Sequence, residues 1–286
     1  MELQYTCPYW GQEKTSAPLF FARVLEEDYD GIEINLPESR KFVKEFQATL
    51  ENIRSVKRNF IFIAQQVLSP ANESVDEYLN RMKTRLEFLT SLKPDFINSH
   101  TGKDYFSFED NCRIIEVAEN IAWRSGIPVL HETHRGRFTF HAASMLPYLE
   151  KFPTLKLTGD FSHWCTVSES MLQDQKAIIE KIIPHVHHIH ARIGYEHSPQ
   201  VNDPFAPEWR KHSEVFISWW KKIIAAQSIN GKRSLTITPE FGPVPYMPTI
   251  PHSQKPLADQ WQTNIQIKEM LKRKFSAKKR ETMLLL

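Results

Sequence analysis

The sequence is poor in the thiols that build disulfide frameworks and zinc–thiolate sites. Its three cysteines, Cys7, Cys112 and Cys165, are scattered, and none stands in a CxxC pair. This pattern argues against both kinds of site. The N-terminal stretch also lacks a basic segment followed by an apolar run, so it does not resemble a secretory signal. We therefore expect a reducing, cytoplasmic setting.

Long apolar runs and an excess of one charge are also missing. No stretch approaches the roughly 20 apolar residues of a membrane span, so we expect no membrane association. The 36 Lys and Arg stand against 34 Asp and Glu, which leaves a formal net charge of +2. Such a balance provides no strong attraction to nucleic acid or to an acidic membrane surface. We expect neither as a partner.

Glycine is scarce, with 9 in 286 residues, and this bears on the fold class. A doubly wound open sheet usually carries a glycine-rich phosphate turn after its first strand. Here that turn reads CPYWGQEK and holds a single glycine. Short apolar runs alternate eight times with longer segments of helical periodicity, which favours a closed parallel barrel. A length of 286 residues suits a barrel of about 250.

We therefore predict a single-domain α/β protein, a (β/α)₈ TIM barrel over residues 1–276, followed by a C-terminal tail over 277–286. The predicted strands are 3–8, 31–36, 60–65, 95–100, 128–133, 155–160, 186–191 and 234–240. The predicted helices are 16–27, 38–57, 73–92, 107–125, 139–151, 168–183, 207–229 and 257–275. Ser74 and Ser168 are predicted N-caps, and Gly126 and Gly231 mark helix ends.

Four of the predicted strands end on a side chain that can bind a metal. These are Glu132 in PVLHETH, Asp160 in LKLTGDFSH, His190 in VHHIHAR and Glu240 in LTITPEFG, separated by 28, 30 and 50 residues. Parallel strands of one barrel end at the same mouth, so the four side chains are expected to converge. Three carboxylates and one imidazole form a mostly oxygen site for a divalent cation. Mn²⁺ or Mg²⁺ is favoured, with Co²⁺ and Zn²⁺ as alternatives.

The alternation of side chains along the strands supports the same site. Successive side chains point to opposite faces of a strand. In the second predicted strand Ile32 and Ile34 oppose Glu33, and in the seventh His188, His190 and Arg192 share one face. The aliphatic face would contact the helices, which directs the polar face into the barrel. Buried polar groups need partners, because each unpaired one costs several kcal/mol, roughly. A metal and a polyhydroxylated substrate would provide them.

With these residues the chain resembles the xylose isomerase-like TIM-barrel superfamily over about residues 3–275. That superfamily includes sugar isomerases, ketose 3-epimerases, inosose dehydratases and apurinic-site endonucleases. The family's metal ligands on strands five to eight match the four residues named above, and a following histidine matches His163 in GDFSHW. The resemblance implies a divalent-metal-dependent isomerase or epimerase acting on a sugar, a sugar phosphate or a related polyol ketone.

Resemblance to the ketose 3-epimerases further implies roles for individual residues. Glu132 and Glu240 would be both metal ligands and the catalytic pair that transfers a proton through a metal-bound enediolate. The side chains expected to bind a small polyhydroxylated substrate are Glu33, His100, His134, His163 and Arg192. The epimerases usually carry Gly-Glu shortly after the strand-seven histidine, whereas this chain reads HARIGYEH. Arg192, with Arg135 and Arg137, could instead bind a phosphate or carboxylate.

Several alternatives remain open at this stage. A dehydratase would use the same metal site and expel a hydroxyl instead of reprotonating. An apurinic-site endonuclease needs a further strand-three histidine, where this chain has Gln65 and Gln66, and an Asp-x-His pair that the loop after strand seven lacks. A barrel that binds without catalysis is a third alternative. Trp219-Trp220 could cover a partner in a homo-oligomer or pack against the barrel.

Overall fold

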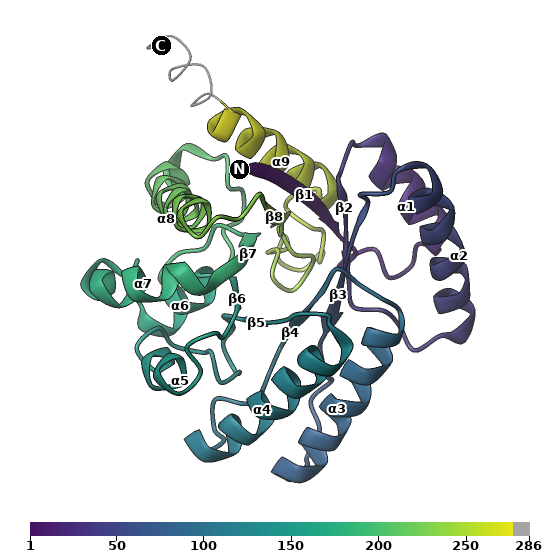
Figure 1. The fold of residues 1–286 in the computed structure, drawn as a ribbon. Helices are drawn as coiled ribbons and strands as arrows, with labels where there is room; N and C mark the ends of the chain where they lie inside the picture. The colour runs from purple at the N-terminus through teal and green to yellow at the C-terminus, as the bar shows by residue number, and fades with distance from the viewer. Residues whose placement is uncertain (277–286) are drawn as a thin grey trace, which may run out of the picture.

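The computed structural model describes residues 1–276, which form a closed parallel barrel with strand order β1-β2-β3-β4-β5-β6-β7-β8. Helices surround the strands, and the first strand lies beside the last helix, α9 (Figure 1). The predicted (β/α)₈ TIM barrel is confirmed. The predicted tail, 277–286, lies outside the described residues.

The strands are β1 (Glu2–Pro8), β2 (Gly31–Ile34), β3 (Ile61–Gln66), β4 (Phe96–Ser99), β5 (Val129–Glu132), β6 (Leu157–Gly159), β7 (Val186–Ala191) and β8 (Ser234–Pro239). The α-helices are α1 (Ala17–Glu26), α2 (Arg40–Val56), α3 (Val75–Ser91), α4 (Phe108–Ser125), α5 (Met145–Lys151), α6 (Ser162–Ser168), α7 (Lys176–Ile182), α8 (Arg210–Ile229) and α9 (Gln260–Ser276). Each strand begins and ends within two residues of its predicted bounds.

The predicted helix boundaries hold where local capping determines them. Ser74 caps α3 in a capping box, in which its hydroxyl accepts from the Glu77 amide and the Glu77 carboxylate accepts from the Ser74 amide. Gly126 ends α4 in the left-handed conformation, with φ of 71°. The first signal is a local hydrogen-bonding pattern and the second a local backbone conformation that glycine favours, which explains why the sequence alone identified them.

The prediction of one helix over 168–183, capped by Ser168, is wrong. Ser168 is the last residue of α6, which begins at Ser162 directly after the sixth strand. The Asp160 carboxylate accepts from the Ser162 amide at 3.1 Å and from its hydroxyl at 2.5 Å, so the helix starts beside the strand end. Glu169 and Leu172 then adopt positive φ, which separates α6 from α7.

The predicted helix over 139–151 is too long at its N-terminal end, because α5 begins only at Met145. Thr139 belongs instead to the loop after β5. Its hydroxyl donates to the main-chain carbonyl of Glu132, and its own carbonyl accepts from Trp164 Nε1 at 2.7 Å. Tertiary hydrogen bonds thus hold this segment against the strand end and override its helical pattern.

The tryptophan pair on α8 is covered by the chain itself. Trp219 and Trp220 are 8% and 3% exposed, and Trp219 packs edge-on against Phe161, with 5.7 Å between ring centroids. Their packing against the barrel is therefore confirmed, and these two rings offer little exposed surface to a partner. A homo-oligomer stays a prediction.

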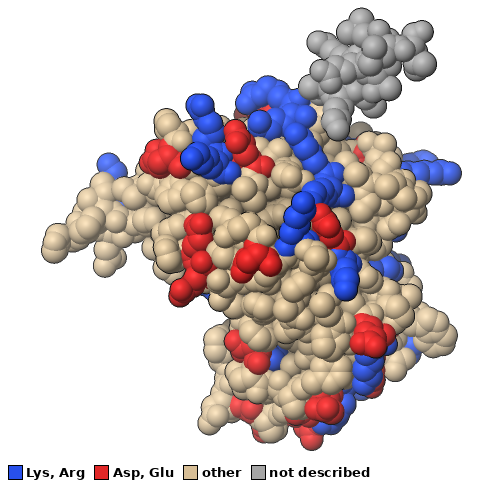
Figure 2. Space-filling view, turned by 90° about the vertical axis from the view of Figure 1, so that its left-hand side faces the viewer, with Lys and Arg blue, Asp and Glu red and all other residues tan. Residues whose placement is uncertain are grey.

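The surface carries charges of both signs. On the face in Figure 2, acidic and basic side chains lie interspersed among uncharged ones. Within residues 1–276, no helix combines the length and the apolar character that crossing a membrane requires. The predicted cytoplasmic setting and the absence of a nucleic-acid partner stay predictions.

The seventh strand separates its histidines by face, and this has a consequence for stability. His188 and His190 are buried inside the barrel, whereas His187 lies half-buried on the opposite face. Burial, with Lys232, Lys156 and His185 nearby, lowers the pKa of His187 to about 4. The unfolded chain takes up this proton near pH 6.5. Stability from neutral His187 is therefore present above pH 6.5 and is lost as the pH falls toward 4.

We predict that His187→Gln loses less free energy of unfolding between pH 7 and pH 4 than the wild type loses, as measured by urea denaturation at a series of pH values. The exposed residue His197 provides the matched control, and His197→Gln should follow the wild-type pH dependence. Parallel curves for wild type and His187→Gln would show that His187 titrates normally in the folded protein.

Candidate metal centre

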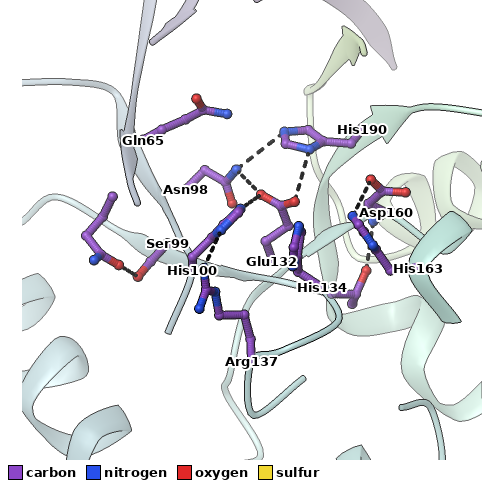
Figure 3. A network of polar contacts seen from close by, with 12 residues as sticks. Gln65, Asn98, Ser99, His100, Glu132, His134, Arg137, Asp160, His163 and His190 are labelled. Carbon is purple, nitrogen blue, oxygen red and sulfur yellow. Dashed lines mark hydrogen bonds and ion pairs between the residues drawn. The ribbon is translucent and has the colours of Figure 1, made fainter. Parts of the chain in front are cut away.

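Four side chains from neighbouring strand ends meet at the carboxyl-terminal mouth of the barrel. Glu132, Asp160, His190 and Glu240 are all buried, and each offers one ligand atom within 4.8 Å of the others. Glu132 and His190 lie in β5 and β7, and Asp160 and Glu240 directly follow β6 and β8, so the barrel brings together the predicted quartet. Figure 3 shows Glu132, Asp160 and His190 of this group. An arrangement of three carboxylates and one imidazole is consistent with a divalent metal.

Two neighbours on β4 and its following loop orient Glu132. Asn98 Nδ2 donates to Glu132 Oε2 at 2.7 Å, and His100 Nε2 donates to the same oxygen at 3.0 Å (Figure 3). The other oxygen, Oε1, lies 3.6 Å from His190 Nδ1. One edge of the carboxylate is thus held by hydrogen bonds, and the other faces the quartet.

His190 supplies the observation that fits a cation best. Its Nε2 contacts Glu33 Oε1 at 2.9 Å, on the side away from the quartet. Its Nδ1 is fully buried and lies 2.7 Å from Glu240 Oε2, yet it makes no hydrogen bond of acceptable geometry within residues 1–276. A buried polar atom without a hydrogen bond is rare in folded proteins. An imidazole nitrogen held among carboxylate oxygens in this way is suited to share a metal ion with them.

Arg192 is the permanent cation of the site. Its Nη2 lies 2.7 Å from Glu240 Oε2 and 2.9 Å from Asp160 Oδ2, so one guanidinium edge joins two members of the quartet. The side chain is 2% exposed. Although burial opposes its charge, Asp160 and Glu240 raise the pKa of Arg192, which stays protonated. Its Nη1 is buried and has no hydrogen-bond partner among the residues that the structure describes.

The buried charges do not balance within the protein. Glu33, Glu132, Asp160 and Glu240 are each at most 4% exposed, and Arg192 is their only neighbour in the described barrel with a permanent positive charge. Burial raises the pKa of Asp160 to about 6; Arg192 opposes that rise, and Glu240 and Glu132 add to it. Burial lowers the pKa of His190, but Glu240, Glu33 and Glu132 outweigh it and raise that pKa well above its usual value. The raised pKa of His190 reflects the negative charge around it, which a divalent cation would relieve.

Several solved protein structures share this fold at low sequence identity. No protein-family model matches the sequence, and no curated protein does so either. A probable 3-DHS dehydratase from Bacillus anthracis is 20% identical, with a TM-score of 0.59 over 86% of this chain and 95% of that one. The 3-keto-D-glucoside 4-epimerase from E. coli is 13% identical, with a TM-score of 0.63 over 95% and 100%. A xylose isomerase-like TIM-barrel protein from Mycobacterium smegmatis, in complex with magnesium, is 12% identical, with a TM-score of 0.56 over 92% and 96%.

The chain adopts the xylose isomerase-like TIM-barrel fold. At these identities the likeness concerns the fold alone and does not extend to the chemistry.

Three imidazoles form a row beside the quartet of this xylose isomerase-like barrel. The ring centroids of His100 and His134 are 4.4 Å apart, and those of His134 and His163 are 3.8 Å apart. Burial, with the neighbouring charge of His100, lowers the pKa of His134 well below its usual value. Burial likewise lowers the pKa of His163, whose two ring nitrogens have no hydrogen-bond partner in the described part of the chain. Neutral imidazoles of this kind can both donate to and accept from substrate hydroxyls.

The quartet opens into a cavity of about 290 Å³, near the lower end of the usual range for small-molecule sites. Of the predicted substrate residues, His100, His134 and Arg192 line it, together with Glu132 and Glu240. His163 lies behind His134, fully buried. Glu33 is also fully buried and does not line the cavity; it lies below the quartet, in contact with His190.

Sequence reasoning missed the aromatic wall and one central amide. Tyr9, Trp10 and Tyr246 line the cavity, and the Arg192 guanidinium lies 5.3 Å from the Trp10 ring centroid and 4.9 Å from that of Tyr246. These rings come from the turn after β1 and the long loop after β8, which have no periodicity. Asn98 could have been found, because it shares a strand face with His100 in FINSH.

We predict that this xylose isomerase-like barrel binds one divalent ion per chain and that Asp160→Asn lowers its affinity at least tenfold, because a charged ligand is lost while the shape is kept. Isothermal titration with Mn²⁺ on chelator-treated protein would measure it. Asp174→Asn, an exposed change outside the site, is the control and should keep wild-type affinity. Equal affinities for all three proteins would remove Asp160 from the centre.

Proposed function

We propose that this protein is a divalent-metal-dependent isomerase or epimerase that acts on a small polyhydroxylated ketone, such as a sugar, a sugar phosphate or a related polyol ketone. The reaction would move a proton at the carbon next to the carbonyl. One observation carries the proposal: two carboxylates, Glu132 and Glu240, belong to the candidate metal quartet and also line the substrate-sized cavity.

The metal would be held by Glu132, Asp160, His190 and Glu240. The oxygen-rich set favours Mn²⁺ or Mg²⁺ over Co²⁺ or Zn²⁺, and the structurally similar Mycobacterium smegmatis protein was crystallised with magnesium. When bound, such an ion supplies Lewis acidity, which polarises a carbonyl and acidifies the adjacent C–H bond.

Glu240 is the better placed of the two carboxylates to accept the proton. Its Oε2 is held by Arg192 at 2.7 Å, whereas no hydrogen bond within residues 1–276 involves its Oε1. Glu132 approaches the cavity from β5, three strands away around the barrel, with its Oε2 held by Asn98 and His100. One carboxylate can therefore remove the proton while the other delivers one to a different face of the same carbon.

The rest of the site would bind and orient the substrate. Trp10 and Tyr246 offer apolar ring faces to a sugar or cyclitol ring, and they also shield the Arg192 guanidinium from water. Arg192 lines the cavity, and its guanidinium would interact with an oxygen of the substrate that acquires negative charge. The neutral imidazole of His134 faces the cavity and would bind a hydroxyl.

Dehydration is the second candidate, supported by structural similarity to the Bacillus anthracis dehydratase. It begins with the same proton abstraction and then expels a hydroxyl from the next carbon instead of reprotonating. His100 or His134 could donate a proton to that leaving hydroxyl, because both line the cavity beside Glu132. The two reactions share the role of Glu240 and differ in their products.

We predict that the metal-loaded protein exchanges the α-proton of a ketone substrate for deuterium in D₂O, and that Glu240→Gln slows this exchange at least 100-fold, as expected for loss of a general base. Mass spectrometry of a panel of ketoses, ketose phosphates and inososes would detect the exchange. The same spectra separate an isomer or epimer, which keeps the substrate mass apart from deuterium, from a product that has lost water.

Glu13 provides a matched control because it lines the cavity but lies outside the metal quartet. Glu13→Gln should exchange at close to the wild-type rate. Metal content is measured in both variants, so that loss of the ion is distinguished from loss of the base. Unchanged exchange in metal-loaded Glu240→Gln, or no exchange by the wild type across the panel, would contradict the proposal.

A further inference from the structure

Glu33 is a buried carboxylate that the proposed chemistry does not use. It is 0% exposed, lies on β2 and neither lines the cavity nor belongs to the quartet. A buried carboxylate is stable only when its charge is well compensated. The placement of Glu33 therefore calls for a function within the barrel.

Five side chains donate hydrogen bonds to this one carboxylate. Gln65 Nε2, Asn98 Nδ2 and His190 Nε2 contact Oε1 at 3.1, 3.0 and 2.9 Å. Thr238 Oγ1 and His188 Nε2 contact Oε2 at 2.5 and 3.1 Å. The donors come from β3, β4, β7 and β8, so Glu33 joins strands from several parts of the barrel and is fixed in place by them.

Each oxygen of Glu33 accepts a hydrogen bond from a different histidine. Oε2 accepts from His188 Nε2, and the Nδ1 of the same ring contacts the Thr236 hydroxyl at 2.7 Å. Oε1 holds the Nε2 of His190, which leaves Nδ1 as the nitrogen that faces Glu132 and Glu240. A metal-binding histidine whose second nitrogen donates to a carboxylate has its ring orientation and its ligating nitrogen fixed by that carboxylate.

Asn98 extends the same support to a second member of the quartet. Its Nδ2 donates both to Glu33 Oε1 at 3.0 Å and to Glu132 Oε2 at 2.7 Å. The amide thereby ties the position of Glu132 to that of Glu33. Glu33 and Asn98 thus form a buried hydrogen-bonded pair below the cavity, and this pair contacts two of the four candidate ligands, Glu132 and His190.

We propose that Glu33 is a positioning residue for the metal centre, acting through His190 Nε2 and through Asn98 to set the His190 and Glu132 ligand atoms. It does not contact substrate. This replaces the sequence-based expectation of substrate binding with a role below the cavity. The inference rests on the proposed metal quartet, but it does not depend on which reaction the centre performs.

Glu33→Gln is the test, because the amide keeps the shape and one carbonyl acceptor for His190 while it removes the charge. We expect Mn²⁺ and Mg²⁺ affinity to fall 10–100-fold, the usual effect of losing a partner of a metal-binding histidine. Isothermal titration measures the affinity. In the Mg²⁺-loaded protein, ¹H–¹⁵N spectra of the histidine rings should show the His190 Nε2 proton moved upfield, as its hydrogen bond to a carboxylate is lost.

Thr238→Val is the matched control. It removes a donor to Oε2 of the same carboxylate and leaves the Oε1 contact with His190 intact. We expect its metal affinity to stay within about threefold of the wild-type value, and its His190 Nε2 proton to keep its position. Thermal melting of both variants verifies that they are folded.

Equal loss of affinity in Thr238→Val and Glu33→Gln would overturn the proposal, since Glu33 would then act only through general packing. Wild-type affinity in folded Glu33→Gln would overturn it as well. These outcomes are separable from failure of the proposed function. A protein that binds metal but exchanges no α-proton would contradict the isomerase proposal and leave the role of Glu33 intact.

Discussion

Burial of four carboxylates in one barrel is the constraint on which the site depends. Glu33, Glu132, Asp160 and Glu240 lie within a few strands of one another, nearly removed from solvent. Unpaired charges in such a place would destabilise the fold strongly, so each must be matched. The surrounding residues meet that requirement in three ways. Arg192 forms ion pairs with Asp160 and Glu240, five side chains donate hydrogen bonds to Glu33, and the quartet is arranged to bind a cation.

The groups that compensate these buried charges lie in layers along the barrel axis. At the bottom, Glu33 is satisfied entirely by protein donors. Above it, the quartet is only partly satisfied, because His190 Nδ1 lies among carboxylate oxygens and has no hydrogen bond to any described residue. At the top, Arg192 and His134 line the cavity. Protein satisfies the deepest charge, a metal would satisfy the middle layer, and substrate would satisfy the groups at the mouth.

Local patterns predicted the strands well and some of the helices poorly. Alternation with period two is imposed by the backbone, so β2 and β7 could be recognised together with their inward faces. The helix predicted over 168–183 failed because tertiary contacts decide that region. Asp160 starts α6 at Ser162, and residues with positive φ then separate it from α7. Tertiary contacts of this kind cannot be recognised from the residue pattern of a short stretch of sequence.

The sequence by itself determined which side chains face inward and that four strand ends carry metal-binding groups. Those facts follow from strand alternation and from the common direction of parallel strands, which are local properties. Only the tertiary structure decided the depth of each inward side chain. Strand register places Gln65 beside Asn98 and His190 beside Thr238. That register puts Glu33 below the quartet, whereas His134, which was also expected to bind substrate, lies at the cavity. Depth depends on the stagger between neighbouring strands, and no single strand contains that information.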